Sequence, residues 1–161
     1  KVVDKNLSDP QEIPWISDIF RILKKNPTIK NIYFELGSTF AQLSGSNPER
    51  CCHMLGQMIQ TAGADHIVWG TDSIWWGSPQ WQIEAFRRLQ MPDDLIKRFK
   101  LKPLTDKVKK KIFGKNSAKV YGIDVKAKMN AIPTDYVTKL KEKYRADGTQ
   151  PSNTQYGWIR A

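Results

Sequence analysis

The strongest candidate for chemistry in this sequence is Asp72, which follows His66–Gly70, a short run rich in apolar and β-branched residues. A carboxylate at the end of a buried strand can bind a hard cation or accept a proton from water. Ser73 could orient this carboxylate through a hydrogen bond, or it could simply be a turn residue. One carboxylate cannot catalyse hydrolysis alone, so the sequence predicts a site to which other residues contribute.

Two tryptophans follow Asp72 closely and could line a substrate pocket. Trp75 and Trp76 precede a helix start at Ser78-Pro79. Binding pockets are mostly apolar with a few fixed polar groups, so these two indoles could face a substrate. They could equally pack against the C-terminal helices and close the loop. The sequence leaves both interpretations open.

A second acidic residue lies in another apolar run, Asn31–Leu36, which has the length and composition of a buried strand. An unpaired charge there would be costly, so Glu35 could face a polar site and line a substrate pocket, or it could pair with a cation in a structural ion pair, which we favour over a role in catalysis. Ser38 begins a segment rich in Ser and Gly, residues 38–46, which we expect to be a loop. Because this loop would follow the carboxyl end of the strand, Ser38 could contact a substrate or could only connect two elements.

The elements that would position these residues alternate between helix and strand. Helical periodicity covers residues 14–25, 47–62 and 78–89, and the last two begin with a capping residue followed by proline. Strands separated by helices predict a parallel sheet with right-handed crossovers. Two strands cannot form such a sheet alone, so we expect further strands in sequence upstream of Lys1.

Beyond Leu89 the pattern is helical. We expect helices over residues 91–99, over residues 105–113 with a stop at Gly114, and from Thr134 onward. We also expect a short turn over residues 117–121 that is closed by Gly122. Residues 147–161 have no periodicity and are expected to wrap the domain or fray. We therefore predict a main domain of residues 1–122 and a basic helical extension and tail of residues 123–161.

Two segments resemble a known family. Residues 63–73, GADHIVWGTDS, and 111–121, KIFGKNSAKVY, are similar to the last strand and closing helix of the amidohydrolase-related family of metal-dependent TIM-barrel hydrolases. The Asn-Ala motif of that helix reads Asn116-Ser-Ala here, with Ser117 between Asn and Ala. The resemblance covers Pro14 to Gly122. It implies the α/β class, specifically the C-terminal part of a (β/α)8 TIM barrel (the last βα units) with an additional C-terminal helical extension.

The resemblance implies a divalent metal, usually zinc, held by histidines from earlier strands and by Asp72, which would also accept a proton. Metal-activated water would attack a C–N or C–O bond of a small-molecule substrate, and a metal-dependent decarboxylase of the same family is the alternative. The expected His-x-His pair is missing from this sequence. His53 lies in a helix and His66 at the wrong end of a strand, so we expect both to be surface or hydrogen-bonded structural residues.

We therefore expect this chain to be inactive alone. It would be a fragment or one half of an assembly, completed by the missing N-terminal half of the barrel or by association as a homo-oligomer. Cys51 and Cys52 are adjacent and cannot readily form a relaxed disulfide with each other. No signal peptide or membrane span is recognisable, so we expect no membrane partner and take the cytoplasm as the default compartment, although a signal sequence could precede Lys1.

The positive charge of the chain is concentrated in one region. Residues 97–145 carry 16 Lys and Arg against 4 Asp and Glu, whereas the rest of the chain carries 10 against 12. The stretch Lys107–Lys111 could bind phosphates, which makes a basic nucleic-acid-binding or interaction module the rival function from a different class. No aromatic residues are interleaved with these lysines, so we expect a solvated helix face and regard nucleic acid as an unlikely partner.

Overall fold

The computed structural model describes residues 9, 11–131 and 134–148. The chain divides into two units, Lys1–Ser117 and Ala118–Ala161. The boundary that the sequence suggested after residue 122 stays a prediction. The first unit contains both strands and all the candidate site residues. No helix among the described residues is long and apolar enough to cross a membrane.

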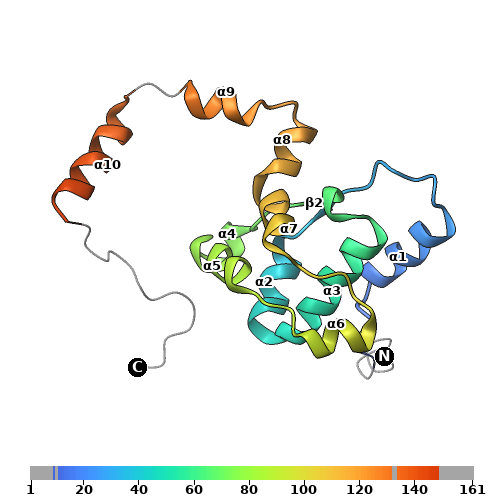
Figure 1. The fold of residues 1–161 in the computed structure, drawn as a ribbon. Coiled ribbons are helices and arrows are strands. Elements are labelled where there is room, and N and C mark those ends of the chain that lie inside the picture. The colour runs from blue at the N-terminus through green and yellow to red at the C-terminus, as the bar shows by residue number, and fades with distance from the viewer. Residues whose placement is uncertain (1–8, 10, 132–133, 149–161) are drawn as a thin grey trace, which may run out of the picture. The chain divides into compact units, whose positions relative to one another are not determined.

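The first unit contains a small parallel sheet surrounded by helices (Figure 1). Its first half runs in the order α1 (Ile16–Lys25), β1 (Phe34–Glu35), α2 (Gly37–Ser46), α3 (Pro48–Thr61), the 3-10 turn η1 (Ala64–His66) and β2 (Ile67–Val68). The strands pair in parallel, with Phe34 opposite Ile67 and Glu35 opposite Val68. The described part of the chain is therefore mainly helical with a two-stranded parallel sheet, which is compatible with a fragment of the α/β class.

The second half is helical, as expected. It comprises α4 (Ser73–Trp76), α5 (Gln80–Arg88), α6 (Asp93–Phe99), α7 (Asp106–Lys110), the π-helical segment η2 (Lys111–Lys115) and the start of α8 (Asn116–Val120), which the unit boundary divides. The predicted stop at Gly114 is wrong, because the helix passes through this residue as a wide π turn. Gly122 has a φ of 64° and ends α8 as predicted. The second unit contains α9 (Val125–Asn130), which was not predicted, and α10 (Tyr136–Ala146), which was.

The segment predicted as a loop, residues 38–46, is instead helix α2. Its Ser and Gly content indicated a loop, but Phe40 and Ala41 are buried on one side of the helix. Burial of this apolar face outweighs weak intrinsic helix propensity. The chain therefore crosses from β1 to β2 through two helices, and Ser38 lies in the first turn of the first of them.

The core beside the sheet is built from aromatic rings. Phe86 is fully buried and lies 5.4 Å from Phe40, 5.1 Å from Trp69 and 4.9 Å from Phe113, measured between ring centroids. These rings join α2, the segment after β2, α5 and η2 into one cluster. Trp15 lies outside this core, since it precedes α1 with a φ of 70° and is 84% exposed.

Asn116 ties the closing helix to the second strand. Its side-chain amide donates hydrogen bonds to the carbonyl oxygens of Ala64 (2.7 Å) and Ile67 (2.6 Å), and the residue is buried. We expect Asn116→Ala to lower the free energy of unfolding by about 1–3 kcal/mol, because the buried carbonyl group of Ile67 and the partly buried carbonyl group of Ala64 lose this donor. Urea unfolding measures the effect.

The matched control for this variant is Asn26→Ala. Asn26 also donates its side-chain amide to a carbonyl, that of Ile22, but it is exposed at the end of α1. Water can replace that bond, so the expected loss is within about 0.5 kcal/mol. Equal losses in the two variants would show that Asn116 has no special structural role.

Candidate active site at the carboxyl ends of the strands

Two carboxylates meet where the parallel strands end. Glu35 is the last residue of β1, and Asp72 lies four residues after Val68, the last residue of β2. Asp72 adopts a left-handed conformation, with φ of 46° and ψ of 38°, that turns the chain from the strand into α4. Aspartate tolerates this conformation better than most residues do. The sequence singled out both positions, but it did not predict that they would lie together.

The first turn of α2 supplies hydrogen bonds to both carboxylates. The backbone N–H of Ser38 donates to Asp72 Oδ2 at 2.8 Å, and the backbone N–H of Gly37 hydrogen-bonds Glu35. The first N–H groups of a helix have no partners within the helix, and the helix dipole favours negative charge there. The helix that replaces the predicted loop therefore holds the acidic pair in place.

The environments of the two acids shift their pKa values in opposite directions. Hydrogen bonds from the side chain and backbone of Ser38 hold the pKa of Asp72 below its ordinary value, so Asp72 is ionised near neutral pH. Loss of hydration raises the pKa of Glu35, and the nearby charge of Asp72 raises it further. Two acids whose pKa values are pushed apart are able to play different proton-transfer roles.

Two glycines make room for the acidic pair. A Cβ atom on Gly37 would lie 2.6 Å from Glu35 Oε2 and 2.8 Å from Asp72 Oδ2. A Cβ atom on Gly70 would overlap the carboxylate of Glu35. Glu35 thus lies directly against the backbone that follows each strand. Neither glycine was singled out from the sequence, although each follows an apolar run and that position is the signal that could have identified it.

Trp76 is connected to the acidic pair through Ser38. Its indole N–H donates to Ser38 Oγ at 2.8 Å, and its carbonyl oxygen accepts a bond from the Trp81 indole at 3.0 Å. Trp75 and its neighbour Ile74 are 81% and 87% exposed. In the described structure, the Ser38 side of the site therefore has a fixed indole, and the two residues before that indole present apolar surface to solvent.

The structure changes the interpretation of Glu35 and Ser73. The expected cation partner of Glu35 is not found, since no ion pair of this residue occurs within the described part of the chain. Its neighbour is another acid, Asp72. Among the described residues, the hydrogen bonds that shift the pKa of Asp72 come from Ser38, whereas Ser73 begins α4.

The two histidines differ from each other. His66 is a hydrogen-bonded structural residue, as predicted, because its Nδ1 lies 3.0 Å from the carbonyl oxygen of Ile32 and its ring stacks on Tyr33. His53 is neither at the surface nor hydrogen-bonded. It is fully buried in α3 against Phe99, and neither ring nitrogen has a hydrogen-bond partner among the described residues.

This burial predicts that the fold is sensitive to acid. Burial lowers the pKa of His53 from its ordinary 6.5, and the positive charges of Arg50 and Arg98 lower it further. The negative charges of Glu49 and Asp9 raise this pKa and offset part of the effect of burial. The unfolded chain therefore binds a proton more readily than the folded chain. The contribution of neutral His53 to the free energy of unfolding should be fully present above about pH 6.5. It should be lost as the pH falls from there toward the pKa that His53 has in the folded chain.

Urea unfolding between pH 7.5 and 5 tests this expectation. His53→Leu should remove that part of the pH dependence, because no ionisable group then remains at the position. His66→Gln is the matched control and should retain it. If the His53→Leu variant kept the full slope, the acid sensitivity would come from other groups.

The basic stretch is partly used within the fold. Lys109 is buried and donates its ammonium group to the carbonyl oxygen of Arg87 at 2.9 Å. Lys111 forms an ion pair with Asp65 at 2.8 Å. Lysines engaged in this way are less available to phosphates, so these contacts weigh against the nucleic-acid interpretation.

The donor atoms of the site fit one part of a metal centre. Carboxylate oxygens are suitable ligands for divalent cations, and Asp72 is ionised and exposed. No group of three or more His, Cys, Asp and Glu side chains that could hold a metal ion occurs in the part of the chain that the structure describes. The remaining ligands of any metal centre would have to come from elsewhere.

The model of the family described as Amidohydrolase matches residues 8–123 of this chain. Comparisons with curated proteins and with solved structures each found no match. The matched segment contains both strands, the acidic pair and Asn116, and it agrees with the resemblance noted in the sequence. Family membership supports a hydrolase-like parent function. The chain belongs to the amidohydrolase family.

Proposed function

We propose that this chain provides the last βα units of a (β/α)8 barrel in a metal-dependent hydrolase, with Asp72 as a metal ligand and proton acceptor. One observation carries the proposal: Glu35 and Asp72 meet at the carboxyl ends of two adjacent parallel strands. Active sites of such barrels lie at this end of the strands. The family match adds support for a hydrolase.

The small size of the sheet supports the barrel part of the proposal. The described sheet has two strands with two paired residues each. Parallel sheets are normally covered on both faces and contain more strands. In our proposal, strands outside this sequence pair with this sheet and bring the histidines that complete the metal centre, so the chain is inactive alone.

The proposed role of Asp72 follows from its contacts. Ser38 fixes the Asp72 carboxylate through its backbone N–H and keeps it ionised, which suits both cation binding and proton acceptance. A divalent cation, zinc in the proposal, would lower the pKa of a bound water and polarise the bond under attack. Asp72 would take the proton of the attacking water and pass it to the leaving nitrogen or oxygen of a C–N or C–O bond.

Metal analysis tests this proposal directly. The intact mass of the product of the full gene would be compared with that of this 161-residue chain, and bound metal would be measured in both by mass spectrometry. The proposal expects about one divalent metal per full-length chain, and less for this chain alone. A full-length product that binds no metal would rule out the metal-dependent mechanism.

A further inference from the structure

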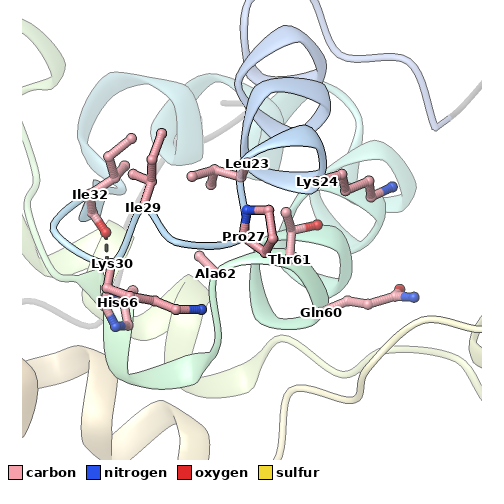
Figure 2. Close-up of a pocket in the computed structure, with 10 residues that line it drawn as sticks. All are labelled: Leu23, Lys24, Pro27, Ile29, Lys30, Ile32, Gln60, Thr61, Ala62 and His66. Atoms are coloured by element: carbon pink, nitrogen blue, oxygen red, sulfur yellow. Dashed lines mark hydrogen bonds between the residues drawn. The ribbon is translucent and has the colours of Figure 1, made fainter.

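A cavity with a volume of about 320 Å³ lies at the opposite ends of the strands from the acidic pair. Two of its lining residues mark this position, because Ile32 precedes β1 and His66 directly precedes β2. The end of α1, the segment that leads into β1 and the end of α3 form its walls (Figure 2). The volume falls within the range of small-molecule sites. Nothing in the proposed hydrolysis uses this cavity.

The lining of the cavity combines an apolar wall with positive charge. Leu23, Ile29 and Ile32 supply apolar surface, and Lys24 and Lys30 are its charged residues. Its lining contains no acidic side chain from the part of the chain that the structure describes. Neither lysine has an ion-pair partner among the residues that the structure describes. A cavity of this kind suits a ligand that has an apolar body and a negative charge.

The charge of the cavity remains positive when the helices are included. Helices α1 and α3 both end here, and each helix end contributes about half of a negative charge. The two lysines therefore exceed the two helix ends by about one positive charge. Lys24 lies in the last turn of α1, where a cation also stabilises the helix itself. Lys30 lies outside any helix, so this structural reason does not account for its position.

The end of the cavity near Lys30 also contains a ring that is held by two contacts. His66 is held there by its bond to the Ile32 carbonyl and by stacking on Tyr33. Figure 2 shows Lys30 and His66 toward one end of the lining residues, with Lys24 and Gln60 toward the other. A negative group near Lys30 would meet a flexible cation beside a fixed ring.

We propose that this cavity binds a small organic anion, either a carboxylate or a phosphate monoester, carried on a short apolar chain or ring. The anionic group lies at Lys30, and the apolar body lies against Leu23, Ile29 and Ile32. Lys24 adds positive potential from the other end. The site is distinct from the acidic pair, whose negative charge would repel the same ligand.

Titration of the full 161-residue chain with hexanoate and hexyl phosphate, followed by amide NMR, tests this proposal. We expect saturable shifts around Ile29, Lys30 and Ala62 with at least one of the two ligands. Lys30→Gln should weaken that binding about tenfold, because it removes a charge-assisted hydrogen bond. Lys24→Gln should weaken it less. Lys25→Gln is the matched control, because Lys25 lies beside Lys24 in the last turn of α1 but does not line the cavity. The Lys25→Gln variant should bind the ligand as tightly as the unaltered chain does.

The outcomes separate the ligand types. Binding of hexanoate alone identifies a carboxylate site, and binding of hexyl phosphate alone identifies a phosphate site. The proposal would be overturned if hexylamine bound as tightly as the two anionic ligands. It would also be overturned if inorganic phosphate bound as tightly as hexyl phosphate. Equal affinity of the Lys30→Gln and Lys25→Gln variants would also overturn it, provided that thermal melting shows both variants to be folded.

Discussion

Asp72→Asn is expected to lower the turnover of the proposed hydrolase by roughly 10²–10⁴-fold while leaving the fold intact. The substitution removes the negative charge and the proton acceptor without changing the volume of the side chain. Asparagine also tolerates the positive φ of this position, and its side-chain oxygen can still accept the bond from the Ser38 N–H. The loss should therefore appear in activity and not in stability.

Chromogenic esters and anilides of p-nitrophenol and p-nitroaniline would be screened for a substrate, and turnover of the two enzymes would then be compared. Asp65→Asn is the matched control. Asp65 is an exposed acid before β2 that forms an ion pair with Lys111, and its loss should change turnover little. Near-normal turnover of the Asp72→Asn enzyme would remove Asp72 from the mechanism.

Gly70→Ala is expected to reduce turnover by up to about 100-fold through displacement of Glu35, because misplacement by about 1 Å can have that effect. The new methyl group would occupy the space of the Glu35 carboxylate. This carboxylate is the flexible end of an exposed side chain, so it can swing away at a small cost in stability. The expected loss in the free energy of unfolding is about 1 kcal/mol. Turnover and urea unfolding measure the two effects separately.

Gly45→Ala is the control for this variant, because a Cβ atom there meets no other atom within 4 Å and the residue lies within α2. It should stabilise the protein slightly and leave turnover unchanged. A double-mutant cycle with Glu35→Ala completes the test. Adding Gly70→Ala to a chain that already lacks the Glu35 carboxylate should have little further effect. A full additional loss would mean that Gly70 acts independently of Glu35.

The parts of the fold that were predicted correctly depend on local signals. Asn47 and Pro48 begin α3 as expected, since the Asn47 side chain accepts a bond from the Arg50 N–H. Gly63 follows that helix with a φ of 90°. The prediction failed for α2, where local composition indicates a loop and the burial of Phe40 determines the outcome. Burial of this kind depends on residues far away in the sequence, so periodicity over a short segment does not reveal it.

The site was predictable to a similar extent. The position of Asp72 after a strand identified it without reference to any contact. Its partners were not identifiable, because two of the groups that hold the acidic pair are backbone N–H groups at Gly37 and Ser38, which carry no side-chain signal. The meeting of Glu35 with Asp72 also depends on strand register, with Glu35 opposite Val68. A sequence pattern names the residues of each strand but does not fix this register.

The π turn of η2 has a consequence for how the length of this chain can vary. The N–H of Asn116 bonds to the carbonyl oxygen of Lys111, five residues earlier, so this turn contains one residue more than an α-helical turn. Lys111 before the turn and Asn116 after it are both anchored to the segment around β2. A helix can thus gain or lose a residue between two anchored points without disturbing either one.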